Sequence, residues 1–419
     1  MSTVTQIAHA AKLASKALAT TTGSARNQAL LSMAQALRKE SAAILAQNAL
    51  DVKGARAAST SEALLDRLLL TDARIDDMAK ALEVLASLDD PLGRVQEDRT
   101  LENGLHIERV SVPLGLVAMV YEARPNVTAD AAGICIKTGN AAILRAGSLA
   151  AHSCVKIAQV LHAAACSAGM PENCIRIIET TDRSATDELM SLHGTVDVLV
   201  PRGGAGLIRH CVENAKVPVI ETGVGNCHIY VHESADIAMA ESIVLNAKCQ
   251  RPGVCNAAES LLVDAAIAQR ALIAILPALA AAGVVVHGDA ATQAIGEACG
   301  VSVLAATQDD WATEYLALEM SVCVVAGQKE AMDHIDRFGT GHSEAIIAKD
   351  AAAAERFLAT VDAAAVYVNA STRFTDGGQF GLGAEIGIST QKLHARGPFA
   401  ANALTSYKYI IHGAGQVRG

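Results

Sequence analysis

Two cysteines in the segment 246–259, NAKCQRPGVCNAAE, are the first residues in this sequence that could carry out covalent chemistry. A Pro-Gly pair lies between Cys249 and Cys255 and ends any helix that enters from residues 236–247. A strand-like run at 257–263 follows directly. A cysteine on a rigid turn between a helix and a strand is well placed to present a thiolate nucleophile. The alternative is that both cysteines are small buried hydrophobic residues, the commoner situation for an arbitrary cysteine.

Four loops that could bind phosphate groups follow predicted strands upstream of these cysteines. The loops are EARPNVT after 115–121, RAGS after 141–145, PRGGAG after 196–200 and ETGVG after 217–221. Each offers glycine, a cation or a helix N-terminus, which suits phosphate. No G-x-G-x-x-G follows a strand, so the ordinary dinucleotide fingerprint is absent. One such loop is a weak signal, but four on successive strand ends predict a nucleotide site.

The elements that must position these loops alternate between strand-like and helical patterns. Further strands are predicted at 175–178 and 229–231, with helices at 128–137, 152–167, 187–192 and 207–215. This alternation indicates a doubly wound parallel sheet, on which ligands lie at the carboxyl ends of the strands. Residues 1–90 are predicted to be helical and to lack chemistry of their own, with helices at 28–47, at 62–69 and after a cap at Asp72.

A second α/β series follows Cys255. Its predicted strands are 257–263, 283–287, 322–326, 344–348 and 365–369, and its helices are 265–282, 290–299, 330–338 and 351–359. The glycine-rich run 369–392 is too long for an idle connection in a compact domain and is predicted to be a functional loop. Asn103-Gly104 predicts a hairpin within 101–112, and the run 403–412 could pair with it. A lone hairpin is marginal in water, so it should pack on another domain or subunit.

Composition limits the classes of function. The 419 residues can bury a large core, and the net charge of −10 argues against nucleic-acid binding as the main role. Mean hydropathy is +0.28, yet no apolar run reaches the roughly 18 residues of a membrane span. The N-terminus lacks the pattern of a secretory signal, so we expect a cytoplasmic protein whose ten cysteines are reduced thiols.

Six motifs resemble those of one known enzyme family. They are YEARPNVT (121–128), KTGNAAILRAG (137–147), VPRGGAGL (200–207), QRPGVCN (250–256), GTGHSEAI (339–346) and VNASTRFTDGGQFGLGAE (368–385). They are similar to the γ-glutamyl phosphate reductase family of the aldehyde dehydrogenase superfamily, over essentially the whole chain. The resemblance implies an aldehyde-dehydrogenase-like α/β fold with two doubly wound parallel-sheet domains and a small β extension. It implies an NADP(H)-binding domain at 1–98 and 113–235, a catalytic domain at 236–398 and an oligomerisation extension at 99–112 and 399–419.

The reaction that the resemblance implies is the NADPH-dependent reduction of L-glutamyl 5-phosphate to L-glutamate 5-semialdehyde and phosphate, the second step of proline biosynthesis. Cys255 matches the family's catalytic cysteine, whose thiolate displaces phosphate to give a thioacyl enzyme. Asn126 and a backbone N–H near Cys255 are the candidates for binding the oxyanion. Spacing from the TGN turn at 138–140 instead places Glu122 at the superfamily's asparagine position. The alternative for Asn126 is to cap a helix that starts near Thr128.

The resemblance also implies the cofactor residues. Arg145 stands where aldehyde dehydrogenases commonly carry a lysine, and Ser148 replaces an acidic residue often found in NAD-preferring members. A cation beside a small hydroxyl leaves room for a 2′-phosphate, so we expect NADP(H). The other cofactor candidates are Gly203 and Gly204 at the pyrophosphate turn, Glu221 at a strand end and Glu319 at a ribose-binding position. Glu221 aligns with the water-activating base of hydrolytic members, a role that is unnecessary when phosphate is the leaving group.

For the substrate, Arg251 is the best phosphate ligand, and Arg373, Thr375 and Gly377 are candidates in the glycine-rich loop. The alternative for each arginine is a surface ion pair with a carboxylate. We expect no metal, because the histidines share no ligand spacing.

We expect a homodimer or homotetramer, with the upstream glutamate kinase as a candidate partner and no nucleic acid or membrane. The competing functions are an acylating or ordinary aldehyde dehydrogenase for another small aldehyde, a thiol hydrolase or transferase that pairs Cys255 with a histidine, and a non-catalytic scaffold.

Overall fold

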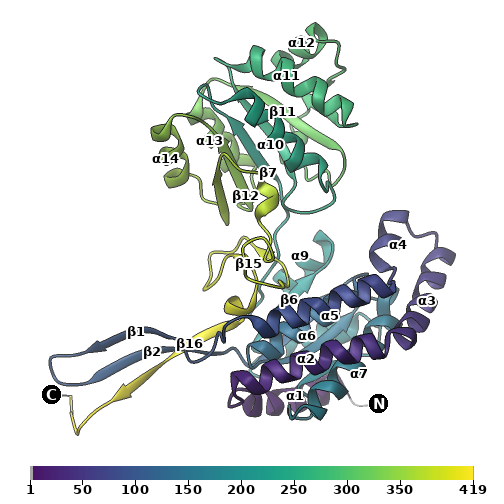
Figure 1. Cartoon of the computed structure of the whole chain (residues 1–419), viewed down its shortest axis with the longest axis vertical. Coiled ribbons are helices and arrows are strands. Elements are labelled where there is room, and N and C mark those ends of the chain that lie inside the picture. Colours follow the sequence, from purple (N-terminus) through teal and green to yellow (C-terminus); the bar gives the residue numbers. More distant parts are fainter. Residues whose placement is uncertain (1–2, 419) are drawn as a thin grey trace. The chain divides into compact units, whose positions relative to one another are not determined.

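The chain, described over residues 3–418 by a computed structural model, forms two compact units (Figure 1). The first unit runs to Thr222 and also contains Gly381–Gly387 and the C-terminal segment from Phe399. The second unit contains Gly223–Phe380 and Ile388–Pro398. The division at residue 222 lies ahead of the boundary predicted at residue 235, because strand β7 (Cys227–Val231) belongs to the sheet of the second unit.

The first unit is built on a four-stranded parallel sheet with the order β5-β4-β3-β6. The strands are β3 (Leu116–Tyr121), β4 (Ala141–Ala146), β5 (Ile175–Ile177) and β6 (Val198–Arg202). Every residue of β3 and β4 is buried, as their continuous apolar runs predict. The prediction of a strand at 217–221 is wrong. This segment makes a single β-bridge, between Leu199 and Val219, because Pro218 has no N–H with which to extend the pairing.

Nine α-helices pack in the described part of the first unit. They are α1 (Val4–Leu18), α2 (Gly23–Lys39), α3 (Ser41–Ala57), α4 (Glu62–Leu68), α5 (Asp72–Ser87), α6 (Pro125–Lys137), α7 (Ala151–Ser167), α8 (Ser184–Ser191) and α9 (Ala205–Asn214). The helix predicted at 28–47 is two helices, which meet at Glu40. The cap predicted at Asp72 is one residue off: Thr71 caps α5 and accepts a hydrogen bond from the N–H of Arg74.

One helical stretch of this unit, Ser148–Ser167, passes the length and hydropathy test for a membrane span. It consists of the short 3-10 helix η1 (Ser148–Ala150) and α7, and 44% of it is buried inside the protein. Because α7 contacts α2, α3 and α6, the stretch has the environment of a core helix.

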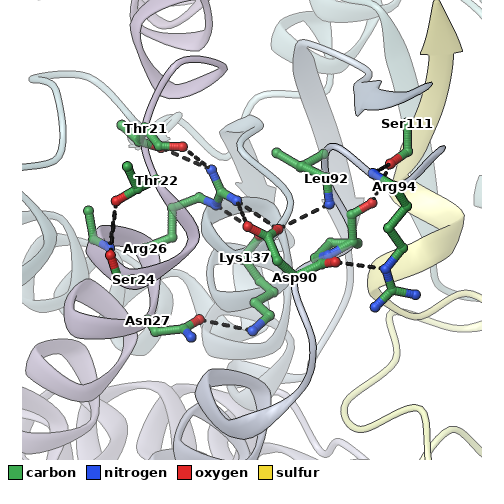
Figure 2. A network of polar contacts seen from close by, with 12 residues as sticks. Thr21, Thr22, Ser24, Arg26, Asn27, Asp90, Leu92, Arg94, Ser111 and Lys137 are labelled. Carbon is green, nitrogen blue, oxygen red and sulfur yellow. Dashed lines mark hydrogen bonds and ion pairs between the residues drawn. The ribbon is translucent and has the colours of Figure 1, made fainter. Parts of the chain in front are cut away.

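A buried arginine joins four segments of the first unit (Figure 2). The side chain of Arg26 on α2 is only 2% exposed and forms two hydrogen bonds, of 2.7 and 2.6 Å, with the carboxylate of Asp90. It also donates to the carbonyl of Lys137 at the end of α6 (3.1 Å). The ammonium of Lys137 in turn donates to Asn27 (2.9 Å) and to the carbonyl of Leu88 after α5. These contacts hold together α2, the end of α6 and the segment after α5 that leads into the β extension.

The β extension is a three-stranded antiparallel sheet with β2 in the centre. Its strands are β1 (Val95–Thr100), β2 (His106–Pro113) and β16 (Thr405–His412). The predicted pairing of the C-terminal run with the hairpin is confirmed, since Thr405 to His412 pair with Pro113 to His106. The turn is longer than the predicted two residues: Leu101 donates to the carbonyl of Leu105, and Gly104 supplies the positive φ of +84° that the loop needs.

The second unit is built on a seven-stranded parallel sheet with the order β10-β9-β11-β8-β7-β12-β13. Besides β7, the strands are β8 (Ala258–Asp264), β9 (Val285–Gly288), β10 (Leu304–Ala305), β11 (Glu319–Val325), β12 (Ser343–Ile347) and β13 (Ala365–Val368). The helices are α10 (Ile237–Cys249), α11 (Ala268–Ala281), α12 (Ala290–Ala298), α13 (Gln328–Phe338) and α14 (Ala351–Thr360). The short elements are η2 (Asp310–Ala312), η3 (Thr372–Phe374), β14 (Ile388–Ser389) and β15 (Gly397–Pro398), with η4 (Ala401–Leu404) in the first unit.

Both faces of this larger sheet are covered by helices. Ile229 and Val231 on β7 pack in a core with α10 and α11, whereas the intervening Tyr230 packs in a second core with Phe357 of α14. Alternate residues of a strand point to opposite faces, so a strand buried on both sides must be apolar throughout. The predicted fold class, an α/β fold of the aldehyde dehydrogenase type with parallel sheets and a small antiparallel extension, is confirmed.

Candidate active site

Cys255 lies on an irregular turn between α10 and β8, as the Pro-Gly break predicts. Helix α10 ends at Cys249, and the chain stays irregular until β8 begins at Ala258. The N–H of Ala257 donates to the carbonyl of Val254 (3.1 Å) and closes a tight turn around Cys255. Cys255 is half-buried, so its backbone is held by the protein while part of the residue reaches solvent.

The backbone of Cys255 rests on the segment that leads into β7. A Cβ on Gly225 would lie 1.6 Å from the carbonyl oxygen of Cys255, so only glycine fits at this contact. The same carbonyl accepts a hydrogen bond from the thiol of Cys227 (3.2 Å). The N–H of Gly225 donates to the carboxylate of Glu314 (2.8 Å). The ETGVG loop, predicted to bind phosphate, therefore ends in a glycine that supports the cysteine.

Asn256, the residue after the cysteine, ties the turn to the loop that contains η3. Its amide nitrogen donates to the carbonyl of Thr375 (2.8 Å), and its backbone carbonyl accepts from the hydroxyl of Thr372 (2.7 Å). Its side-chain oxygen is hydrogen-bonded to the guanidinium of Arg373. Sequence reasoning missed this residue. One signal in the sequence could have indicated it: an amide side chain between the cysteine and a buried strand needs hydrogen-bond partners.

Arg373 and Arg251 place positive charge beside the cysteine turn. Arg373 is half-buried, and its Nε donates to the side chain of Gln250 (3.0 Å). Burial and the neighbouring Arg251 both lower the pKa of Arg373, whereas Asp376 and Cys255 act in the opposite direction. Arg251, which is exposed, therefore lies close enough to Arg373 for the two guanidinium groups to repel each other. Two such guanidinium groups favour binding of an anion such as phosphate.

Two other predicted substrate residues lie inside the same loop. Thr375 is fully buried, and its hydroxyl is hydrogen-bonded to the hydroxyls of Ser343 and Tyr367 (2.7 Å each). Its side chain therefore supports the loop from within. Gly377 is also buried, and the next N–H, that of Gly378, donates to the carboxylate of Asp376 (2.9 Å).

A buried ion pair flanks the cysteine turn on both sides. Lys248 near the end of α10 and Glu259 at the start of β8 are both fully buried, and their charged atoms are 2.5 Å apart. Burial raises the pKa of Glu259 to about 7 although Lys248 opposes the rise, and burial lowers the pKa of Lys248. A pair of this kind restricts the two ends of the turn to one arrangement, because separating the charges would leave each unpaired in the interior.

All these groups lie at the amino end of the second unit's sheet. Cys255 precedes β8, Cys227 and Ser343 begin β7 and β12, and Glu319 begins β11. The carboxyl-end rule, from which we predicted the phosphate loops of the first unit, therefore does not describe the position of these groups. Glu319, predicted to contact the cofactor ribose, lies 3.3 Å from the ring of His287.

The predicted cofactor loops do lie together at the carboxyl edge of the first unit's sheet. The N–H of Gly147 donates to the carbonyl of Tyr121 (2.7 Å), and the N–H of Glu122 donates to the carbonyl of Arg202 (3.1 Å). These bonds join the loops that follow β4, β3 and β6. The carboxylate of Glu122 accepts from the N–H of Gly204 (3.0 Å), the N-cap of α9. The positive N-terminus of α9 therefore binds an anion of the protein itself, the carboxylate of Glu122.

The same part of the first unit contains a cation with an unused hydrogen-bond donor. Arg145 is 7% exposed and donates through one terminal nitrogen to the carbonyls of Thr181 (2.8 Å) and Asp182 (3.1 Å). Its Nε is buried and has no partner among residues 3–418. Burial and the nearby Arg183 lower the pKa of Arg145. An unsatisfied cation near glycine loops, with the exposed Ser148 at the start of η1, fits a nucleotide phosphate.

Comparisons with known proteins identify the family. The model of the aldehyde dehydrogenase family matches residues 1–296. The γ-glutamyl phosphate reductases of Moorella thermoacetica and of Caldanaerobacter subterraneus subsp. tengcongensis are 56% and 52% identical, covering 97% of this chain and 97% and 98% of theirs. The crystal structure of the Thermotoga maritima γ-glutamyl phosphate reductase matches this protein with a TM-score of 0.97 and 45% sequence identity. The match covers 100% of both chains.

The chain belongs to the γ-glutamyl phosphate reductase family. The resemblance recognised in the six motifs is confirmed. The protein is thus an oxidoreductase of the aldehyde dehydrogenase type, a group whose members use nicotinamide cofactors.

Two further predicted site residues, Asn126 and Glu221, lie in the first unit. Asn126 is exposed in the first turn of α6, and its amide donates to Asp130 (3.2 Å), whose pKa burial raises to about 6. Because α6 begins at Pro125, the alternative role of Asn126 as a helix cap is wrong. Glu221 is half-buried in the irregular segment after the Leu199–Val219 bridge, next to the end of the first unit at Thr222.

Proposed function

We propose that this protein reduces L-glutamyl 5-phosphate to L-glutamate 5-semialdehyde and phosphate with NADPH, the second step of proline biosynthesis. The substrate assignment is supported by identities of 56% and 52% to γ-glutamyl phosphate reductases over nearly the full length. The observation that carries the mechanism is the half-buried Cys255 on its supported turn, with Arg251 and Arg373 beside it.

Cys255 acts as the nucleophile in this mechanism. Its thiolate attacks the acyl carbon, the C–O bond between that carbon and the phosphate breaks, and inorganic phosphate leaves with the bonding electrons. Arg251 and Arg373 stabilise the phosphate as its charge increases, because guanidinium groups bind phosphate oxygens through charge-assisted hydrogen bonds. The backbone N–H near Cys255 and the amide of Asn126 are the proposed donors to the oxyanion, each worth about 3–4 kcal/mol if well placed.

The second half of the reaction returns the enzyme to its starting state. The thioester carbon would receive the hydride that a reduced nicotinamide supplies when bound. Cys255 then leaves as a thiolate when the tetrahedral oxyanion collapses to the aldehyde, so no water-activating base is needed. Glu221, the counterpart of such a base in hydrolytic relatives, is therefore proposed as a contact to the cofactor rather than as a catalyst.

The preference for NADP(H) is proposed from the first unit. Arg145 and Ser148 would hold the 2′-phosphate, and Gly203 and Gly204 would lie under the pyrophosphate at the start of α9. The buried donor of Arg145 that lacks a partner within residues 3–418 supports this assignment. Replacing Arg145 by methionine should lower the ratio of kcat/KM for NADPH over NADH by about tenfold or more, because a charge-assisted hydrogen bond is lost.

The decisive experiment measures NADPH oxidation with glutamyl phosphate generated enzymatically in the assay. Cys255→Ala should reduce the rate to background, whereas Cys249→Ala, the matched change at the end of α10, should retain activity. Equal rates for wild type and Cys255→Ala would contradict the mechanism. The reverse reaction distinguishes the proposed enzyme from an ordinary aldehyde dehydrogenase. Oxidation of glutamate semialdehyde should require phosphate, whereas an ordinary aldehyde dehydrogenase would release the free acid without phosphate.

The assembly and location follow as further proposals. A homodimer or homotetramer formed through the β extension is supported by Tyr407, Tyr409 and Ile411, which alternate along β16 and are about half exposed. A cytoplasmic location and a functional partnership with the glutamate kinase that makes the acyl phosphate complete the proposal.

A further inference from the structure

Three side chains that are common metal ligands meet where α7 ends and β5 begins. His162 and Cys166 lie on the last turns of α7, and Cys174 directly precedes β5. A nitrogen of His162 and the two sulfur atoms all lie within 4.8 Å of one another. His162 and Cys166 are half-buried, and Cys174 is fully buried. None of these residues belongs to the candidate active site.

The chain reverses tightly to bring the second cysteine back to the helix. His162 and Cys166 are four residues apart, so they lie on one face of α7. Helix α7 ends at Ser167, and the φ of +90° at Gly169 allows its N–H to donate to the carbonyl of Cys166 (3.0 Å). The N–H of Cys174 then donates to the carbonyl of Pro171 (3.2 Å), and this turn directs the chain into β5.

The three side chains lie close enough for one ion with nitrogen and sulfur ligands to bind them after rotation of the imidazole ring. Zinc binds sulfur at about 2.3 Å and nitrogen at about 2.0 Å, so a tetrahedral ion holds the two atoms about 3.6 Å apart. The sulfur of Cys166 is 3.7 Å from each ring nitrogen of His162, so the ring must turn for Nδ1 to face the ion. The carboxylate of Glu172 lies 3.2 Å from Nε2 of the same ring. A carboxylate that accepts the second N–H of a histidine is a common support for a metal ligand.

We propose that Nδ1 of His162 and the sulfur atoms of Cys166 and Cys174 bind a divalent cation of the zinc class, with Glu172 accepting the Nε2–H. Two thiolates and an imidazole favour such a borderline-soft ion over magnesium or calcium. Each cation displaces two thiol protons to solvent, and the two thiolates balance its charge. The site joins α7 to the amino end of β5, at the opposite edge of the sheet from the cofactor loops, so its role is structural. The proposal does not depend on the proposed function.

The test is a Co²⁺ titration of the reduced, chelator-treated full-length protein. A tetrahedral thiolate site gives a sulfur-to-cobalt charge-transfer band in the near ultraviolet, and we expect one equivalent of Co²⁺ per chain. Cys166→Ser and Cys174→Ala should abolish the band, and Glu172→Gln should weaken binding by about 10–100-fold. Cys299→Ser, which changes another half-buried cysteine after a helix, should bind Co²⁺ like the wild type.

Two outcomes would overturn the proposal. The reduced protein could take up no Co²⁺, or the band could survive in the Cys166→Ser/Cys174→Ala variant. If Cys174→Ala fails to fold, Cys166→Ser and His162→Ala decide the question, because both residues are half-buried and on a helix. If air oxidation joins Cys166 to Cys174 and the reduced protein does not bind Co²⁺, the two cysteines form a disulfide pair and the metal-site proposal is wrong.

Discussion

The α-carbon of Gly225 faces the backbone of Cys255 so closely that no side chain fits between them. A Cβ at this position would lie 1.6 Å from the carbonyl oxygen of Cys255 and 2.7 Å from its α-carbon. The obstructing atoms are backbone atoms, which cannot rotate away as a flexible side chain could. The position of the proposed nucleophile is therefore set by a glycine thirty residues earlier in the sequence.

Gly225→Ala should inactivate the enzyme without unfolding it. The added methyl group must push the Cys255 turn aside, and a displacement of about 1 Å at a reacting atom can lower the rate about 100-fold. We expect kcat for NADPH oxidation to fall at least this far, with circular dichroism unchanged. Gly54→Ala is the matched control, because Gly54 lies in α3 with open space around it. A fully active Gly225→Ala variant would show that the contact does not position the thiolate.

The stability of the protein should fall in mild acid because His342 is buried. Its pKa is lowered to about 4 by burial, whereas a histidine in the unfolded chain titrates near 6.5. Between these values the unfolded state binds the proton and the folded state does not, so stability is retained above pH 6.5 and lost as the pH falls toward 4. The shift corresponds to about 3 kcal/mol.

Urea unfolding at several pH values checks this prediction. His342→Gln should flatten the loss of stability between about pH 6.5 and 4.5, whereas His9→Gln on the exposed face of α1 should not. Some slope should remain in His342→Gln, because burial also lowers the pKa of His334, to about 3. Identical slopes for His342→Gln and the wild type would contradict the assignment.

Removing Asp90 should destabilise the first unit strongly. Asp90→Ala leaves the guanidinium of Arg26, which is 2% exposed, without its carboxylate partner (Figure 2). Loss of one member of a fully buried ion pair typically costs about 3–5 kcal/mol, and the cost here should lie below that range because Asp90 is 37% exposed. Asp66→Ala breaks the exposed pair with Arg74 and should cost less than about 1 kcal/mol. Equal urea midpoints for Asp90→Ala and Asp66→Ala would show that the buried network adds no more than a surface pair.

Much of the fold could be predicted from local sequence patterns. The apolar runs at β3 and β4 predict strands buried on both faces, and the Pro-Gly pair predicts the break before Cys255. These predictions succeed because periodicity and breakers act over a few residues. The run 217–221 is similarly apolar but makes only the Leu199–Val219 bridge, because Pro218 has no N–H with which to extend the pairing.

The sequence by itself determined the fold class, the family and the identity of the cysteine on the turn, because these depend on short motifs and their order. Only the tertiary structure decided what surrounds that cysteine: Gly225 beneath it, Asn256 bonded to the η3 loop, and Thr375 buried. It also brought His162, Cys166 and Cys174 together. These contacts follow from the order of strands in each sheet and from one tight reversal of the chain, and backbone geometry of this kind leaves no pattern in the spacing of residues.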